Sequence, residues 1–547
     1  MTQKLQVWLA MGLLLISIQA FSQQVVIVEP DQGLNIGALN QAIDGGDKSG
    51  NTIFELRRGG LYLLNGAISH TGYKLHIRAE AGTGPLPVLQ PAVDQLGESQ
   101  NHFNPGGSLT LEGLYIQGRG ELGAIANRPI VVGGDSSRII IDNCFIDYTE
   151  QAVVRLNSSY NDVYITNSII RNSLRPENPS NGRVIDTRSN PQDTVLIENS
   201  TIYNNGATII RLGGGFMNYY CINHNTIYKV EFNGGVDIDV ALKAKVTNNI
   251  FYNFGYRANT SLHDALWVID SMYNYGAYTD ADREFDFKNN CFFIDSQIGD
   301  VIDQYAPDTL YRFAEDDTLE LNPIHYKYKL RTDLFANDSL LNLPSFDQPV
   351  PSVLNFIANG QVDTSNIFRE SLNFDNPPPL NLPYWQFFTE NNYQIRDLNP
   401  PNPYADEDPN VLGVVTTGAY TFNYNGDSRS ATAAEGGMPL GDPRWTPYTI
   451  SLEEFNQNKN RVMVYPNPFN NNLFFEFEAE NPSTVTVTIV DVVGREIFNQ
   501  SVDATNGNNK IQLNLAPIKE SGIYFYEVET QTNEGSMILG SGKLIRE

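Results

Sequence analysis

Hydrophobic and polar residues alternate over short stretches between residues 111 and 293, and one short pattern recurs there. Each copy has apolar residues on both sides of a central Asn or His, and alternation at period two predicts a strand with one buried face. The six clear copies are residues 141–146, 165–170, 197–202, 222–227, 246–251 and 287–292. Their central residues follow one another after 24, 32, 25, 24 and 41 residues, a recurrence typical of a solenoid.

A second apolar strand follows each of five copies by about ten residues. These second strands are predicted at 153–156, 184–187, 209–212, 236–238 and 266–269. No helical pattern of ten or more residues separates the strands, so alternating βαβ units are not expected. Two or three strands per coil, joined by turns, predict an all-β chain built on a parallel β-helix.

The recurring polar residue has a mechanical explanation. Asn tolerates the left-handed backbone that a bend between strands requires, and stacked amides can bond to one another along the coils. We therefore favour a structural ladder over a ligand site for the Asn column, with His224 as a member of it and not a catalytic base. The column consists of Asn143, Asn167, Asn199, His224, Asn248 and Asn289.

The composition limits the partners. The chain has 547 residues and a formal net charge of −27, which argues against a nucleic-acid partner, since nucleic acid selects a basic face. Acidic polysaccharides are also disfavoured unless a cation or a local basic patch intervenes. The three cysteines give no disulfide framework.

The ends of the chain differ from its middle. Residues 1–22, with an apolar stretch at 7–18, predict a secretory signal peptide and no membrane span in the mature protein. The β-helix is predicted at 23–305. Residues 306–450 lose the repeat and become rich in Pro and Asn, which predicts an irregular extension packed on the β-helix or capping it. After a linker at 451–461, alternating strands at 462–547 predict a small β-sandwich.

This last segment carries specific motifs. They are Tyr-Pro-Asn-Pro-Phe at 465–469, Ile-Val-Asp-Val-Val-Gly-Arg at 489–495 and Gly-Ile-Tyr at 522–524. With them the segment resembles the type A sorting domain of the type IX secretion system. The resemblance implies interaction with the type IX secretion machinery and an extracellular or outer-membrane-surface location. It also implies that this domain is removed after export, so that the function of the mature protein lies upstream.

The repeats at about 30–305 resemble the pectate-lyase-like, right-handed β-helix superfamily. The nearest branch is that of chondroitinase B, the alginate lyases and related uncharacterised secreted β-helix proteins. The segment 437–445 resembles the end of those uncharacterised proteins. The resemblance implies polysaccharide as the partner, although a fold alone does not set function.

The second strands carry charged residues at matching positions, which are Arg155, Asp186, Arg211 and Asp237. In a β-helix these side chains would stack outward at the ~4.8 Å spacing of adjacent strands. One interpretation is a surface ion ladder that contributes little to stability. The other is a groove in which arginines hold the carboxylates or sulfates of an extended glycan.

Catalysis by β-elimination needs a group that neutralises the uronate, a base and a proton donor. Asp237 and Asp239 are the expected ligands of a calcium ion, and Lys243 or Lys245 is the candidate base. The resembling lyases place an Arg on a later coil, a role that Arg257 could take, but the spacing here departs from theirs. Trp267 is a candidate for stacking on a sugar ring.

The leading hypothesis is therefore a secreted lyase that cleaves a uronate-containing glycan. Two alternatives stay open, a non-catalytic glycan-binding surface protein and a structural adhesin. Whether the protein is an enzyme is left undecided, because no established catalytic motif is intact in the sequence.

Overall fold

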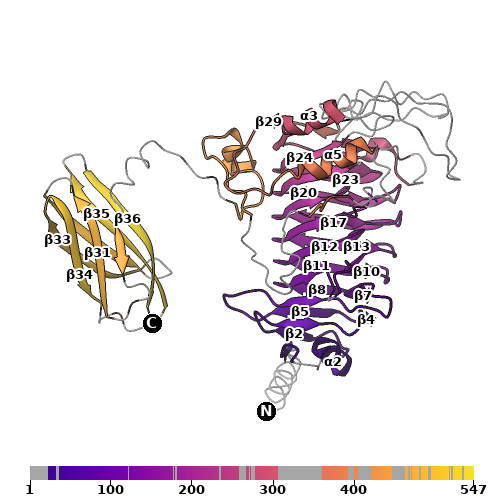
Figure 1. Ribbon diagram of the computed structural model, residues 1–547, viewed down its shortest axis with the longest axis horizontal. Helices are drawn as coiled ribbons and strands as arrows, with labels where there is room; N and C mark the ends of the chain where they lie inside the picture. The colour runs from indigo at the N-terminus through magenta and orange to yellow at the C-terminus, as the bar shows by residue number, and fades with distance from the viewer. Residues whose placement is uncertain are drawn as a thin grey trace, which may run out of the picture. The chain divides into compact units, whose positions relative to one another are not determined.

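The computed structural model divides the chain into two compact units, Met1–Tyr448 and Thr449–Glu547 (Figure 1). It describes residues 23–32, 36–120, 122–176, 178, 181–232, 236–257, 267–269, 272, 277–305, 360–391, 400–404, 420–445, 447, 462–465, 469, 471–479, 482–490, 495–515, 518, 522–532 and 535–546. The predicted signal peptide at 1–22 and the linker at 451–461 lie outside these residues.

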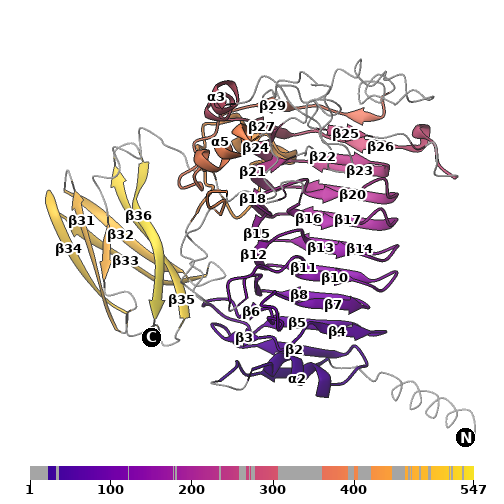
Figure 2. The same cartoon turned by 45° about the vertical axis from the view of Figure 1, so that its right-hand side comes forward.

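Three parallel sheets form the sides of the first unit (Figure 2). Sheet 1 consists of β1 (Gln24–Val28), β2 (Thr52–Leu56), β5 (Leu75–Ala79), β8 (Leu109–Glu112), β11 (Arg138–Asp142), β14 (Asp162–Thr166), β17 (Gln192–Glu198), β20 (Met217–Asn223), β23 (Ala241–Thr247), β26 (Glu284–Asp286) and β28 (Val362–Asp363). Sheet 2 consists of β3 (Leu61–Leu63), β6 (Val88–Gln90), β9 (Tyr115–Gln117), β12 (Phe145–Thr149), β15 (Ile169–Ser173), β18 (Thr201–Asn205), β21 (Thr226–Phe232), β24 (Ile250–Arg257), β27 (Asn290–Phe293) and β29 (Ile367–Arg369).

Sheet 3 consists of β4 (Ile68–Thr71), β7 (Phe103–Gly106), β10 (Ile130–Val132), β13 (Ala152–Leu156), β16 (Arg183–Asp186) and β19 (Ile210–Arg211). A separate pair, β22 (Val236–Asp239) and β25 (Trp267–Ile269), carries the corresponding strands of the next coils. One coil runs through a strand of each sheet and then enters the next strand of sheet 1. The structure thus confirms the all-β, right-handed parallel β-helix expected from the sequence.

The coils stack in register, so that apolar residues of one coil lie on those of the next. In sheet 1, for example, Ile139 pairs with Val163 and Ile141 with Ile165, and all four are fully buried. This column of side chains forms the core. At about 25 cal/mol for each Å² of apolar surface removed from water, such burial is the main force that closes the coils.

Every residue of the predicted Asn column has the left-handed backbone, with φ between 49° and 60°. The side chains that run through the interior, however, belong to the following residue of each repeat. Asn249 Oδ1 accepts the backbone N–H of Asn225 at 2.9 Å, and Asn290 Oδ1 accepts that of Asn249 at 3.0 Å. Ser168 and Ser200 continue this buried ladder. The bend was therefore located correctly, and part of the predicted column does bond along the coils, since Asn289 Nδ2 donates to Asn248 Oδ1 at 3.2 Å and Asn366 Nδ2 donates to Asn289 Oδ1 at 3.0 Å. A second ladder, one residue further on, was not predicted.

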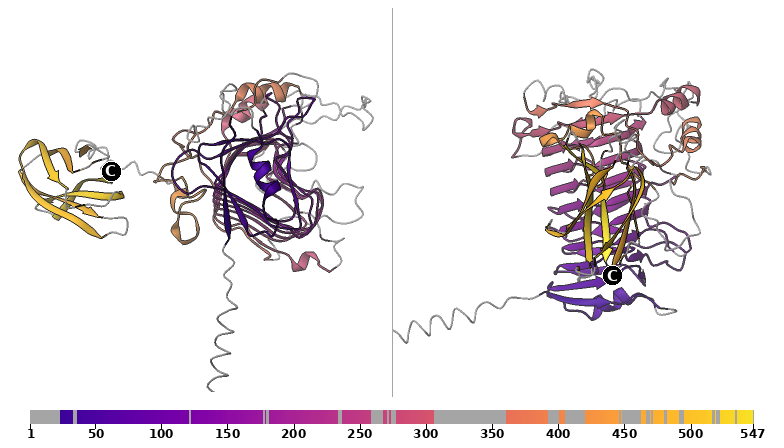
Figure 3. Two further views of the ribbon diagram at one scale, coloured as in Figure 1. Left: turned by 90° about the horizontal axis from the view of Figure 1, so that it is seen from below. Right: turned by 90° about the vertical axis from the view of Figure 1, so that its left-hand side faces the viewer.

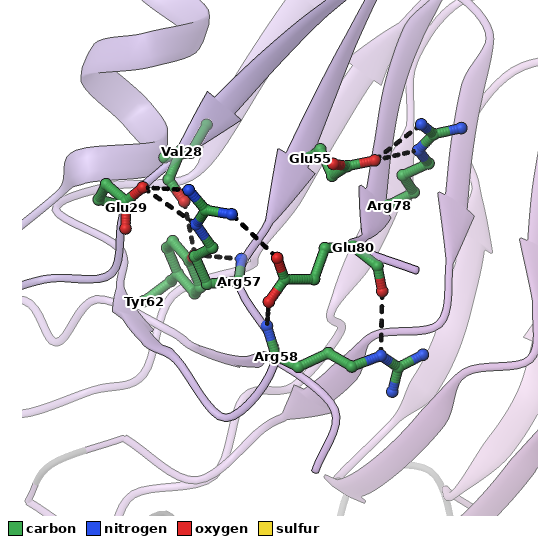
Figure 4. Close-up of polar contacts among 8 residues, drawn as sticks. All are labelled: Val28, Glu29, Glu55, Arg57, Arg58, Tyr62, Arg78 and Glu80. Atoms are coloured by element: carbon green, nitrogen blue, oxygen red, sulfur yellow. Dashed lines mark hydrogen bonds and ion pairs between the residues drawn. The ribbon is translucent and has the colours of Figure 1, made fainter. Parts of the chain in front are cut away.

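Helix α2 (Ala38–Gly45) lies across the first coil, as the view from below shows (Figure 3), and buries Leu39 and Ile43 in the core. Ion pairs join the outer side of these first coils (Figure 4). Arg57 contacts Glu29 at 2.8 Å and Glu80 at 3.0 Å, so one guanidinium links three successive segments.

The sequence repeats predicted that the β-helix ends at residue 305, but the parallel coils continue beyond it. Strand β28 pairs with β26, and β29 pairs with β27. Helices α3 (Ser296–Tyr305) and α5 (Leu382–Glu390) pack against each other through Ile298, Trp385 and neighbouring apolar residues. The short 3-10 helices are η1 (Asp280–Asp282), η3 (Arg429–Thr432) and η4 (Glu435–Gly437).

Residues 440–445 form a clasp on the outer face of sheet 2. Buried Asp442 accepts a hydrogen bond from Thr201 Oγ1 at 2.6 Å, and Trp445 Nε1 donates to the same hydroxyl at 2.6 Å. Phe422, Tyr424 and Leu440 cover the aromatic residues of sheet 2 beside the clasp. This face is therefore occupied by the chain itself.

The second unit is a sandwich of two antiparallel sheets. One contains β30 (Met463–Tyr465), β31 (Asn472–Ala479) and β34 (Gly507–Asn514). The other contains β32 (Ser483–Val490), β33 (Glu496–Ala504), β35 (Gly522–Thr532) and β36 (Gly535–Arg546). Leu473, Phe475 and Val487 belong to a separate core between them.

Candidate functional site

The charged residues of the second strands lie on the outer side of sheet 3. Arg155 of β13 pairs with Asp186 of β16, and Asp186 pairs with Arg211 of β19. Their neighbours Val154, Ile185 and Ile210 point into the core and are fully buried. The three charged side chains therefore stack on consecutive coils, at the ~4.8 Å spacing of adjacent strands.

Five arginines surround Asp186, and we call this set the arginine face. It consists of Arg128, Arg155, Arg183, Arg188 and Arg211, with Asp186 among them. Asp186 Oδ1 lies 3.4 Å from Arg211 Nη1 and accepts the backbone N–H of Arg188 at 3.1 Å. Its Oδ2 lies 3.9 Å from Arg183 Nη1. Within the set, five positive charges face one carboxylate.

The arginine face has a buried layer and an exposed layer. The side chains of Asp186 and Arg183 are only 7% and 12% exposed, while Arg211 is 37% exposed and Arg188 lies in solvent. Arg155 is half-buried and donates from Nε to Asn157 Oδ1 at 3.0 Å. The buried layer positions the carboxylate, and the outer guanidinium groups remain accessible.

Burial and mutual repulsion both lower the pKa values of Arg128, Arg155 and Arg183. Burial, followed by the charges of Arg155 and Arg188, lowers the pKa of Arg128. Burial lowers the pKa of Arg183 to about 10, with Arg211, Arg188 and Arg155 acting in the same direction and Asp186 opposing them. All five groups still carry their charge at neutral pH, so the face presents crowded positive charge that an anion would stabilise.

Arg128 shows that the hydrogen bonding on this face is incomplete. Its Nη2 donates to Gln151 Oε1. Its buried Nε has no hydrogen-bond partner among the described residues. The unpaired Nε is itself shielded from solvent, so a bound anion would meet Arg128 through the guanidinium nitrogens that remain accessible.

The structure does not bring the predicted lysines to this face. Lys243 and Lys245 lie on β23 of sheet 1, and Ala244 and Val246 between and beside them point into the core. Lys243 is 57% exposed and lies 3.5 Å from Glu284. Both lysines therefore lie on a different sheet from Arg211, and the role of either as the base stays a prediction.

Four predicted site residues are placed by their backbone alone. Asp237 and Asp239 lie on β22, Arg257 ends β24, and Trp267 begins β25. Their side chains lie outside the described structure, so the predicted calcium site and the roles of Arg257 and Trp267 stay predictions. Among the described side chains, no group of three or more His, Cys, Asp or Glu converges in a way that could hold a metal ion.

Three arginines of the face were missed in the sequence. Arg128 and Arg183 flank strands at the same register position, and Arg188 follows β16 in the turn. Aligning the repeats on the second strands, with their flanking residues included, would have revealed Arg128 and Arg183. Arg188 gave no signal, because the same position of the turn is occupied by Gly134, Ser158 and Gly213 on the neighbouring coils.

Comparison with known proteins identifies the C-terminal unit. Residues 463–538 match the model of the secretion system C-terminal sorting domain, as the motifs at 465–469 and 489–495 predicted. The chain is thus an exported β-helix protein. This domain directs the protein to the type IX secretion machinery and so to the cell surface or the extracellular medium.

One solved structure similar to this chain is that described as "Crystal structure of pectate lyase Pel9A". It is 14% identical, with a TM-score of 0.31, and the match covers 50% of this chain and 77% of that chain. No curated protein matches the sequence. None of the helices in the described parts of the chain has the length and apolar character needed to cross a membrane.

Proposed function

We propose that this protein binds an acidic polysaccharide along the arginine face of sheet 3. The observation that carries the proposal is the gathering of five arginines around Asp186 in a chain whose net charge is −27. In a protein whose acidic residues outnumber its basic ones, dispersing the basic residues over the surface would favour solubility. Their concentration on one face, against mutual repulsion, is explained by a polyanionic ligand.

The chemistry of guanidinium fits carboxylates and sulfates. Its planar fork donates two parallel hydrogen bonds to such groups, and it remains charged at any pH that the protein meets. Arg155, Arg188 and Arg211 lie on successive coils, so an extended chain with repeated acidic groups can contact all three. Many weak ion pairs then add up along one polymer.

Binding is better supported than cleavage. A lyase needs a base beside the uronate carbon, and both candidate lysines lie on sheet 1. Asp186, the carboxylate within the arginine face, is held by Arg211, Arg183 and the Arg188 backbone, which suits it to positioning. The lyase hypothesis would depend on Arg257 and on a calcium ion at Asp237 and Asp239. The adhesin hypothesis would require that the protein binds no glycan.

Affinity electrophoresis tests this function. The exported protein is run through gels that contain alginate, pectate, chondroitin sulfate or neutral starch. We expect retardation by at least one acidic polymer and none by starch. The double variant Arg155→Ala/Arg211→Ala should lose at least about tenfold in affinity, a loss of ~1.4 kcal/mol or more. Arg138→Ala, which removes a 60% exposed arginine on sheet 1, is the matched control and should bind normally.

The same samples decide between the alternatives. Absorbance of the unsaturated product, followed with calcium and with a chelator, would show lyase activity and add catalysis to binding. Unretarded migration through every acidic gel would overturn the proposal and favour the adhesin.

A further inference from the structure

A row of ring side chains runs beside the arginine face, on the turns that lead from sheet 3 to sheet 1. We call it the aromatic strip, and it consists of Tyr160, Phe216 and Tyr278, with the saturated ring of Pro191 on the coil between Tyr160 and Phe216. Tyr160 N–H donates to Pro191 O at 2.8 Å, and Gln192 N–H donates to Phe216 O at 2.9 Å, so these turns stack coil upon coil. The rings of Phe216 and Tyr278 are stacked, with centroids 5.6 Å apart and planes 6° apart.

Tyr160 is the most unusual member of the strip. It is 54% exposed, and its φ of 57° is left-handed, which is rare for a bulky residue. Its turn is held from inside, since Asn161 Nδ2 donates to Ser158 O and to Gln192 Oε1, each at 3.1 Å. The ring has no aromatic or cation partner among the described residues. The left-handed bend belongs to the turn, since Ser136 has φ 53° at the same place on the preceding coil, so the exposed ring is the feature that folding does not explain.

The aromatic strip and the arginine face share the same turns. Asn157, which binds Arg155, opens the turn that carries Tyr160. Arg188 precedes Pro191 in the next turn. On the following coil, Gly213 lies against the Arg211 guanidinium in the turn that ends at Phe216. These turns connect β13 of sheet 3 to β14 of sheet 1, β16 to β17 and β19 to β20.

We propose that the aromatic strip is a stacking site for pyranose rings, parallel to the arginine face. A glycan would run along the axis of the β-helix, across the strands. Its acidic groups would contact Arg155, Arg188 and Arg211, and the apolar faces of its sugar rings would lie on Tyr160 and Tyr278. This inference rests on the proposed function and adds the residues that distinguish a sugar polymer from any other polyanion.

The test uses two probes, a uronate oligomer and inorganic polyphosphate, which has charge but no ring. Tyr160→Asn removes the ring and places a residue that tolerates the left-handed backbone. We expect its affinity for the uronate oligomer to fall about tenfold, while its affinity for polyphosphate and its melting temperature stay the same or rise. Tyr160→Trp should restore binding of the oligomer. Tyr164→Asn, on the outer face of sheet 1, is the matched control and should leave the affinity for the oligomer unchanged.

The outcomes separate this inference from the proposed function. If Tyr160→Asn binds the oligomer as tightly as the parent while Arg155→Ala/Arg211→Ala does not, the stacking site is refuted and the arginine face stands. If Tyr160→Asn loses oligomer, polyphosphate and thermal stability together, the ring has a structural role and the inference also fails. If neither variant changes the affinity, both proposals fail.

Discussion

Neighbouring residues of the arginine face differ in how deeply they are buried. Asp186 is buried, accepts hydrogen bonds from Arg188 N–H and Arg211 Nη1, and forms an ion pair with Arg183, whereas the side chains of Arg188 and Arg211 reach solvent. Without Asp186, the largely buried guanidinium of Arg183 would lose the negative charge that offsets the neighbouring arginines. The carboxylate therefore makes the concentration of arginines compatible with folding.

His102 gives the fold a dependence on pH. It is fully buried, its Nε2 lies 3.0 Å from Gln117 O, and burial lowers its pKa to about 4. The folded state keeps the ring neutral, while the unfolded state binds a proton below about pH 6.5. Stability should therefore fall as the pH decreases from about 6.5 to 4, by roughly 3 kcal/mol from this residue.

Urea titration at several pH values measures this contribution. The parent protein should lose more free energy of unfolding between pH 7 and pH 4 than His102→Gln, which has no ionisable group there. Parallel pH profiles for the two proteins would show that His102 is not the source.

For single residues, the sequence predicted the features that recur in each repeat and missed the features that occur only once. The left-handed bends were predicted because Asn recurs at similar spacings along the chain and tolerates a left-handed backbone. The Asn column bonds along the coils at Asn248, Asn289 and Asn366 as predicted, but the second ladder through Asn225, Asn249 and Asn290 was missed, because adjacent polar positions do not show which one faces the interior. Lys243 and Lys245 were grouped with Arg211 because distance along the chain does not show which sheet a residue joins.

Among the structural elements, the clasp depends on a backbone that only glycine provides. Gly441 has φ +88°, and a Cβ there would lie 2.6 Å from Thr226 Oγ1 and 2.9 Å from Ile250 Cδ1. Its N–H donates to Asn248 O at 2.9 Å. Residues 440–445 can therefore approach sheet 2 closely enough for Asp442 and Trp445 to bind Thr201.

Gly441→Ala should release the clasp. The left-handed backbone costs about 1 kcal/mol for alanine, and the steric clash adds roughly 1–3 kcal/mol. Gly436→Ala is the matched control, since Gly436 has φ +74° but open space around it. We expect faster hydrogen exchange and proteolysis over 420–445 in Gly441→Ala than in Gly436→Ala. Equal behaviour of the two variants would contradict this account of the clasp.

The repeated strands were predictable because their apolar residues recur at period two in each coil. Strands β28 and β29 were not, since they are short and lie after a long interruption of the repeat. The clasp was seen as a sequence motif at 437–445. Its place on sheet 2 could not be foreseen, because it depends on Tyr203, Tyr228 and Tyr252 of distant coils, which point outward from sheet 2 and are buried under the clasp and its neighbours.

For the whole molecule, the two compact units should unfold independently. Each has its own core, and the sorting domain matched at 463–538 lies entirely within the second. Calorimetry of the full chain should show two transitions, and a chain truncated after Tyr448 should retain one of them at the same temperature. A single transition that shifts on truncation would contradict this independence.

The central claim is that a strongly acidic exported protein holds an acidic glycan on one basic face. Modification by an arginine-specific reagent, mapped by mass spectrometry with and without a bound polyuronate, tests it most directly. We predict that the polymer protects Arg155, Arg188 and Arg211 and leaves Arg138 on sheet 1 reactive. Unchanged modification of the three arginines, or equal protection of Arg138, would contradict the claim.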